Sequence, residues 1–156
     1  MMTIRRAEAG DTPAVAAVFQ AARAGMPYLP RLHSAAEDAR FVAGQLAELE
    51  SWVAVVDGAV AAWLALAPER IEQLYVAPRA QGRGIGARLV AVAQERHARL
   101  DLWTFRANAR ARRFYARLGF AEVEATDGLG NEERLPDVRL EWRLNARPSR
   151  RSEGSR

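Results

Sequence analysis

Apolar residues follow the period of a helix in four stretches of the chain. The first begins at Asp11-Thr12-Pro13, where a capping side chain precedes proline, and its inward stripe is predicted at positions 15, 18, 19 and 22. The second begins at Ser34, which has Glu37 at the spacing of a capping box. The third is predicted from residue 85 to about 99, and the fourth from Asn108 to Leu118, before Gly119.

Short apolar runs typical of strands separate these helices. Two of the runs are joined by Asp57-Gly58, which is a two-residue hairpin signal. The order places an antiparallel meander beside two helical crossovers, so an α/β or α+β fold with a mixed sheet and four flanking helices is predicted. The predicted strands cover residues 3–6, 52–56, 60–66, 71–76, 100–105, 120–125 and 138–144.

The length of 156 residues fits one domain, which we predict over residues 1–146, with a disordered basic tail at 147–156. The absence of cysteine excludes disulfides, thiolate metal sites and a cysteine nucleophile. No metal cofactor is expected. No stretch reaches the roughly 20 apolar residues that cross a bilayer, so we expect a cytoplasmic protein with no membrane partner.

Every basic side chain other than histidine is arginine, and the formal balance of 23 Lys+Arg against 19 Asp+Glu is +4. Four arginines and one acid in the tail supply +3 of this, which leaves the body of the chain close to neutral. We therefore expect no nucleic-acid partner, because such proteins carry a concentrated basic surface. The arginines of residues 106–117 and of the tail leave a nucleic-acid binder as a minor hypothesis.

The most informative segment is a glycine-rich bend between a predicted strand and a predicted helix. Leu74-Tyr75-Val76-Ala77-Pro78 leads into Gln81-Gly82-Arg83-Gly84-Ile85-Gly86. Glycines allow a ligand to approach the backbone closely, and the free N–H groups at a helix start suit a phosphate. The sequence therefore predicts a phosphate or pyrophosphate site here.

Two other phosphate motifs fit this bend poorly. A Walker loop needs a lysine, and the chain has none. The dinucleotide fingerprint has a glycine, or as a variant an alanine, at its third position, which is Leu89 when counted from Gly84 and Ala87, the variant only, when counted from Gly82. The acidic residue that would bind a ribose is also missing from the place where the fingerprint needs it. A turn that serves only to reverse the chain is the remaining structural alternative.

A second informative segment is Asn108 to Phe120, in which Asn108 is a plausible helix cap. Tyr115 lies two helical turns later and is expected to project from about the same face. A phenol presented in this way can donate a proton to a thiolate leaving group. The structural alternative is a tyrosine at the edge of the core.

Together these two segments resemble the GNAT superfamily of acetyl-CoA-dependent N-acetyltransferases. Gln81-Gly82-Arg83-Gly84-Ile85-Gly86 is similar to the family's Q/R-x-x-G-x-G/A pattern, and Asn108 to Phe120 is similar to its second block. The resemblance implies a mostly antiparallel sheet of seven strands with a V-shaped splay between the two central strands. It also implies acetyl-CoA as co-substrate.

The resemblance further implies individual roles. Tyr115 would protonate the departing thiolate, and the Leu74 N–H would polarise the thioester carbonyl. The remaining cofactor-binding residues would be Tyr75, Val76, Gln81, Gly82, Arg83, Gly84, Ile85, Gly86, Ala87 and Asn108.

The acceptor side is less defined by the sequence. Glu72 is the candidate base, because strand alternation places it on the face of Leu74, and Glu69 is its reserve. In this family the loop between the first two helices lines the acceptor cleft, so Tyr28 and Leu29 are candidates for substrate binding. Three acidic residues of the last loop are candidates for attracting a cationic acceptor: Glu132, Glu133 and Asp137. The alternative is that these charges are simply solvated.

The leading hypothesis is an N-acetyltransferase that acetylates a primary amine of a small molecule by direct attack in a ternary complex. The alternatives are a protein N-terminal or lysine acetyltransferase and, in a different class, a catalytically silent acyl-CoA sensor. The acceptor partner would be a small molecule or a peptide, and a homodimer is possible in this family.

Overall fold

A computed structural model describes residues 1–144. The predicted tail at 147–156, and the last two residues of the predicted domain, lie outside these residues. The elements are β1 (Met2–Arg6), a short 3₁₀ turn (Ala9–Asp11), α1 (Thr12–Ala24), α2 (Ala35–Glu48), β2 (Glu50–Val56), β3 (Ala59–Ala67), β4 (Arg70–Val76), a second 3₁₀ turn (Pro78–Ala80), α3 (Ile85–Arg96), β5 (Arg99–Phe105), α4 (Ala109–Arg117), β6 (Ala121–Thr126) and β7 (Asp137–Arg143).

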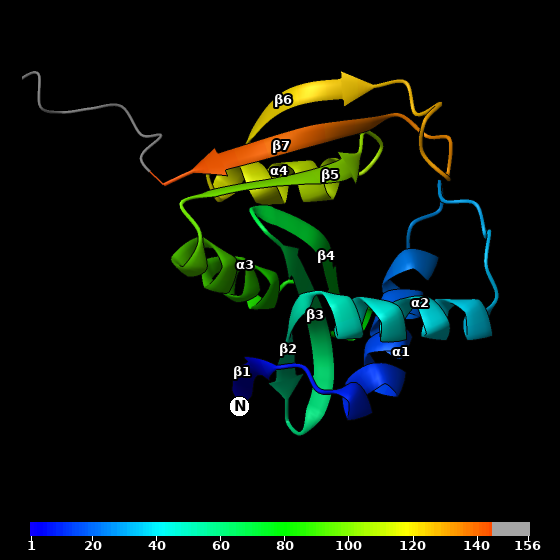
Figure 1. The fold of residues 1–156 in the computed structure, drawn as a ribbon, viewed down its shortest axis with the longest axis vertical. Coiled ribbons are helices and arrows are strands. Elements are labelled where there is room, and N and C mark those ends of the chain that lie inside the picture. The colour runs from blue at the N-terminus through cyan, green and yellow to red at the C-terminus, as the bar shows by residue number, and fades with distance from the viewer. Residues whose placement is uncertain (145–156) are drawn as a thin grey trace, which may run out of the picture.

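One mixed sheet runs through the described part of the chain, in the order β1-β2-β3-β4-β5-β7-β6. All neighbouring strands are antiparallel except the central pair, β4 and β5, which is parallel. This pair shares a single registered position, Arg70 opposite Asp101. The two strands therefore meet at one end and separate toward the other, and Figure 1 shows the two halves of the sheet diverging from this point. The predicted fold class, with its four helices and its splay, is confirmed.

Two apolar clusters cover opposite faces of the sheet. α1 and α2 pack on one face through Val15, Phe19 and Val42, which lie against Trp63 of β3. α3 and α4 pack on the other face with a larger cluster that includes Leu64, Leu89, Leu100, Tyr115 and Leu140. The predicted stripe on α1 is confirmed, since all four positions are buried. The sheet is thus held from both sides while its centre is split.

Most of the predicted local signals form as expected, with two differences. Ser34 and Glu37 make the capping box, and α2 begins directly after it. Asp11 does not cap α1 with its side chain; its carboxylate instead accepts two hydrogen bonds from Arg5 of β1, at 2.9 and 3.0 Å. α3 ends at Arg96 rather than near residue 99, because β5 already begins at Arg99.

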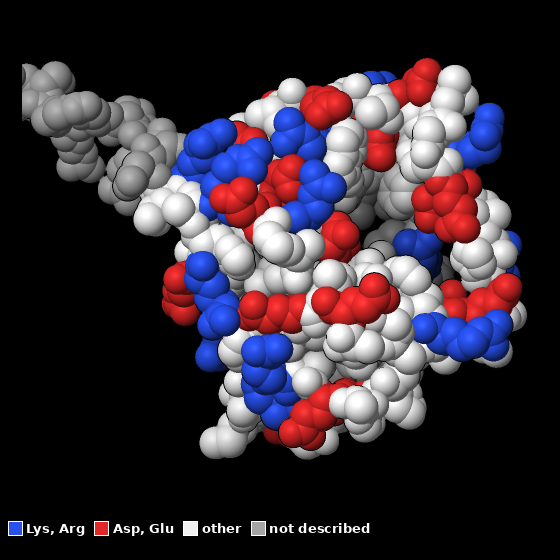
Figure 2. Space-filling model, in the orientation of Figure 1, with Lys and Arg blue, Asp and Glu red and all other residues white. Residues whose placement is uncertain are grey.

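The half of the sheet formed by β5, β6 and β7 has a polar face. Arg99 and Arg139 alternate on it with acidic residues, and each arginine donates to at least one carboxylate. Figure 2 shows arginine and acidic side chains intermixed in the upper part of the molecule, where Figure 1 places these strands. The charges neutralise one another locally, which fits the near-neutral body expected from composition. Within residues 1–144, no helix is both long and apolar enough to cross a membrane.

Candidate active site

A hollow of about 470 Å³ lies where the end of β4 meets the starts of α3 and α4. Its position is the open end of the split between β4 and β5. Of the residues predicted to hold the cofactor, all but Arg83 line this hollow. Arg83 is exposed and lies outside the hollow. The structure therefore brings the two segments singled out in the sequence together around one space.

The bend before α3 leaves backbone groups available to a ligand. Gly82 and Gly84 have φ angles of 82° and 78°, a conformation that side chains disfavour, and a Cβ atom at either would meet nothing within 4 Å. In the described part of the chain no side chain caps α3, and its first intrahelical bond runs from Arg88 N to Gly84 O at 3.1 Å. The amides of Ile85, Gly86 and Ala87 precede that bond, so they point at the hollow from the positive end of the helix dipole. This arrangement fits a pyrophosphate.

Gly86 differs from Gly82 and Gly84 because it allows close packing of two helices rather than a positive φ angle. A Cβ atom at this position would lie 3.2 Å from the ring of Phe114 on α4. The absence of a side chain thus lets α4 approach the first turn of α3 closely. This contact sets the width of the hollow, since Phe114 and Gly86 both line it.

The edge of β4 that faces the hollow has unpaired backbone groups. Ala77 donates its amide to Ala61 of β3 at 2.8 Å. Because hydrogen-bonding groups alternate along a strand, Val76 and Leu74 turn theirs toward the opposite, open edge. The Gln81 side chain donates to Val76 O there at 3.0 Å, and Arg110 of α4 donates to Gln81 at 2.8 Å. The Leu74 amide remains on the open edge, where an extended ligand can pair with it.

Tyr115 projects from α4 into the apolar cluster between the helix and the sheet. Its ring packs edge-on against Phe114 and Phe120, and only 6% of the residue is exposed. Burial raises the pKa of the Tyr115 phenol above its ordinary value, and the neighbouring Tyr75 raises it further. The phenol is therefore protonated at neutral pH, as a proton donor must be. Asn108 caps α4 as predicted, since its side chain accepts from the Ala111 amide at 3.0 Å.

A polar cluster on the other side of Tyr75 was not foreseen. Arg23 at the end of α1 donates to the Tyr75 hydroxyl at 3.2 Å and to Glu133 of the β6–β7 loop at 3.2 Å. Both partners of the ion pair are largely buried. Burial raises the pKa of the Tyr75 phenol, although the Arg23 guanidinium opposes the effect. In the sequence, an arginine near a helix end is expected to be a solvated charge. Arg23 is instead held at this cluster by Glu133, a partner 110 residues later in the chain.

The predicted acceptor-side residues lie next to this cluster. The Tyr28 ring packs edge-on against the ring of Phe105 at the end of β5. Its buried hydroxyl has no hydrogen-bond partner among residues 1–144. Desolvation raises the pKa of the Tyr28 phenol, and Tyr75 adds to the effect. Leu29 lines a separate hollow under the α1–α2 loop. Their roles in binding a substrate stay predictions.

The two candidate bases lie outside both hollows. The register of β3 and β4 skips Glu72, which sits in a β-bulge between Ile71 and Gln73 and is exposed. The bulge interrupts the alternation on which its predicted orientation was based. Glu69 lies at the closed end of the split, where it pairs with Arg99 at 3.5 Å. A role for Glu72 through ordered water stays a prediction.

Comparison with known proteins agrees with this geometry. The family model described as "Acetyltransferase (GNAT) domain" matches residues 47–122, which include β4, the glycine bend and α4. The peptidyl-lysine N-acetyltransferase YiaC of Escherichia coli K12 is 33% identical over 98 residues, which cover 62% of this chain and 66% of that protein. The match thus spans just under two thirds of this relative.

Solved structures extend the likeness over nearly the whole chain. The apo form of YjaB from Escherichia coli superposes with a TM-score of 0.76 at 22% identity, covering 91% of this chain and 97% of that one. YncA of Salmonella typhimurium, solved with its cofactor acetyl-CoA, gives a TM-score of 0.71 at 20% identity, covering 96% and 97%. The chain is thus similar to GNAT acetyltransferases over its central part, and it shares the fold of solved GNAT acetyltransferases over nearly its whole length.

Proposed function

We propose that this protein transfers an acetyl group from acetyl-CoA to a primary amine of a small molecule, by direct attack in a ternary complex. The observation that carries the proposal is the convergence, around one hollow, of the open edge of β4, the uncapped start of α3 and the α4 helix. Tyr115 of α4 is not itself among the lining residues, but its ring packs against Phe114, which is. Each part fits one part of the co-substrate: amides for the pyrophosphate, a strand edge for the pantetheine arm and a phenol for the sulfur.

In this mechanism acetyl-CoA supplies the activated acyl group. The amides of residues 82–87 bind its pyrophosphate, and Asn108 contacts the pantetheine arm. The Leu74 amide donates to the carbonyl oxygen of the thioester and stabilises the negative charge that grows there. Tyr115 gives its proton to the departing sulfur, because its raised pKa keeps that proton in place until the leaving group needs it.

The acceptor must lose a proton before it can attack. Glu72, exposed at the bulge in β4, is the proposed proton acceptor and works through water. The ternary complex is supported by the second hollow under the α1–α2 loop, since Met26 lines both spaces and the two substrates can meet beside it. The same chemistry on a protein amine is the second candidate, because the relatives include a peptidyl-lysine acetyltransferase and a ribosomal-protein-S18-alanine N-acetyltransferase.

The test is thiol release from acetyl-CoA across a panel of amines, amino acids, polyamines, aminoglycosides and peptides. We expect turnover well above hydrolysis with at least one small amine. In the Tyr115→Phe variant, kcat should fall by about 10²- to 10⁴-fold, the usual contribution of a positioned proton donor. Affinity for CoA, measured by calorimetry, should be unchanged, since the ring still fills the same apolar space.

Arg113→Gln is the matched control, because this exposed residue lies on α4 two positions before Tyr115 and does not line the hollow. It should leave kcat within about twofold. Turnover only with peptides would move the assignment to the protein acetyltransferases. Binding of CoA without turnover on any amine would contradict the proposal and favour a silent sensor.

A further inference from the structure

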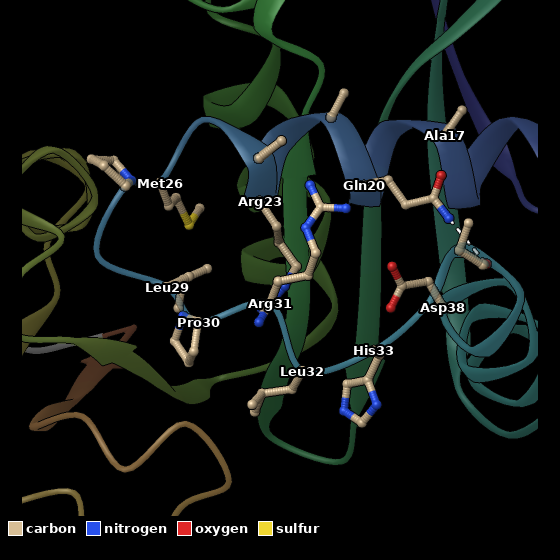
Figure 3. A pocket seen from close by; sticks show the side chains of 14 residues that line it. Ala17, Gln20, Arg23, Met26, Leu29, Pro30, Arg31, Leu32, His33 and Asp38 are labelled. Atoms are coloured by element: carbon tan, nitrogen blue, oxygen red, sulfur yellow. Dashed lines mark hydrogen bonds between the residues drawn. The ribbon is translucent and has the colours of Figure 1, made fainter.

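The hollow under the α1–α2 loop has a volume of about 630 Å³, which is within the usual range for small-ligand sites. Its floor is the outer face of α1, where small side chains leave room: Ala17, Ala21 and Ala24. The loop arches over this floor and supplies apolar walls from Met26, Leu29 and Leu32 (Figure 3). One end is closed by Gln20 of α1, which donates to Ala35 O at 3.2 Å.

Two charged residues of opposite sign face this hollow without partners among residues 1–144. Arg31 from the loop and Asp38 from the first turn of α2 both project into it in Figure 3. Over residues 1–144, neither side chain makes a hydrogen bond or an ion pair, and they do not pair with each other. The other charged residues of the lining are engaged, since Arg23 pairs with Glu133 and His33 contacts Glu132 at 2.9 Å.

A cation and an anion held apart across a small cavity match a ligand that carries both charges. The α-ammonium and α-carboxylate of a free amino acid have this pattern, with the carboxylate toward Arg31 and the ammonium toward Asp38. Within a peptide chain both groups become neutral amides, so an internal residue of a protein would leave both charges unmatched. The apolar walls suit a chain of methylene groups that continues from the charged end.

The route out of the hollow restricts the acceptor further. Met26 lines this hollow and also the cofactor hollow, so a ligand held here reaches the thioester past Met26. An α-ammonium bound by Asp38 stays protonated and cannot attack. The reacting nitrogen must therefore be a second amine at the far end of the chain.

We propose that the hollow under the α1–α2 loop binds the α-amino-acid end of a free diamino acid, and that its ω-amine is acetylated. This inference rests on the proposed function. The ω-ammonium first loses one proton to water. Its nitrogen then bonds to the carbonyl carbon as the carbon–sulfur bond breaks, Tyr115 gives its proton to the sulfur, and the second proton leaving the nitrogen restores the phenol. The products are the ω-N-acetyl amino acid and CoA thiol.

The first experiment measures binding without acetyl-CoA, by calorimetry on the full chain. L-Lysine is compared with cadaverine, which lacks the carboxylate, and with 6-aminohexanoate, which lacks the α-ammonium. Arg31→Gln should weaken the binding of lysine and of 6-aminohexanoate by about tenfold, the usual effect of losing one charged hydrogen bond. It should leave the affinity for cadaverine unchanged. Asp38→Asn should weaken lysine and cadaverine by about tenfold and leave 6-aminohexanoate unchanged.

Matched controls come from α2, where Arg40 and Glu48 are exposed and do not line the hollow. Arg40→Gln and Glu48→Gln should change none of these affinities. The inference is overturned if Arg31→Gln does not weaken the binding of lysine. It is also overturned if Arg31→Gln weakens the binding of cadaverine as strongly as that of lysine. It is also overturned if a blocked peptide with one internal lysine binds as tightly as free lysine.

The second experiment separates this inference from the proposed function. Thiol release is followed with lysine and with norleucine, which has the same α-groups but no second amine. We expect turnover with lysine only. Lysine binding with the predicted response to both variants, but no thiol release on any amine, would refute the proposed function and leave the site. Acetylation of norleucine, or turnover on other amines with no lysine binding, would overturn the inference alone.

Discussion

At one end of the split between β4 and β5, Arg70 donates two hydrogen bonds to the buried Asp101 carboxylate, at 2.8 and 2.9 Å, and Arg139 donates a third at 3.1 Å. At the other end, the strand edges stand apart beside Gly84 and the uncapped start of α3. The same two strands are therefore tied together at one end by the hydrogen bonds of Asp101, and at the other end they leave backbone donors open to a ligand.

This difference separates stability from binding. The closed end supplies its own partners: the Asp101 amide also donates to Glu69 O at 2.9 Å, so both strands are fixed there by main chain and side chain. At the open end, a bound ligand supplies the hydrogen-bond partners of the Leu74 amide and of the first amides of α3. Changes at the closed end should thus act on unfolding, and changes at the open end on cofactor affinity.

The largest effect is expected from Asp101→Asn. The side chain keeps its shape but loses its charge and one of its two acceptor oxygens, so Arg70 and Arg139 lose the negative charge that they share. We expect the free energy of unfolding to fall by about 2 kcal/mol; loss of a buried partner costs more, but both arginines reach solvent, which reduces the loss. Urea unfolding at pH 7 measures this.

Glu122→Gln is the control for that variant, because Glu122 also accepts two hydrogen bonds from one arginine, Arg112, at 2.7 and 3.1 Å. Its side chain is 40% exposed, against 7% for Asp101. The unfolding free energy should change by less than about 0.5 kcal/mol, as is usual for exposed pairs. Equal losses of unfolding free energy in the two variants would contradict the idea that the buried hydrogen bonds of Asp101 stabilise the fold more than an exposed ion pair does.

A smaller effect is expected from acid. Hydrogen bonds from Arg70 are the main cause that lowers the pKa of the Asp101 carboxyl below its ordinary value, against the opposing effect of burial. The unfolded chain therefore takes up this proton at a higher pH than the folded protein. The stabilisation is complete above the ordinary pKa of the carboxyl and is lost as the pH falls through the lowered value.

The measurement is the difference in unfolding free energy between the native protein and Asp101→Asn, followed from pH 7 to pH 3. The difference should stay constant down to about pH 5 and then shrink, because only the native protein has this carboxylate to protonate. Other carboxylates titrate in both proteins and cancel. A difference that is independent of pH would mean that the pairing of Asp101 with the arginines adds no net stability.

The sequence predicts the open end better than the closed end. The glycine bend and the Asn108 cap are local signals, so their geometry follows from a few neighbouring residues. Asp101 sits in an apolar strand run, and its partners are 31 and 38 residues away, so nothing nearby in the chain indicates them. The bulge at Glu72 depends on the register with β3, which no count along one strand can give. Arg23 and Glu133 meet for the same reason only in the folded protein.

The smallest effect on stability, and the sharpest test of the open end, is Gly84→Ala. A methyl group here meets no protein atom within 4 Å, so the cost comes from the φ angle of 78° alone and should be about 1 kcal/mol of unfolding free energy. The methyl also enters the hollow that Gly84 lines, so CoA affinity by calorimetry should fall about tenfold. Gly10→Ala is the matched control, since a methyl there also meets open space but without a positive φ. It should change neither quantity. If Gly84→Ala lowers stability but leaves CoA affinity equal to that of Gly10→Ala, the bend is a turn that reverses the chain and the pyrophosphate binds elsewhere.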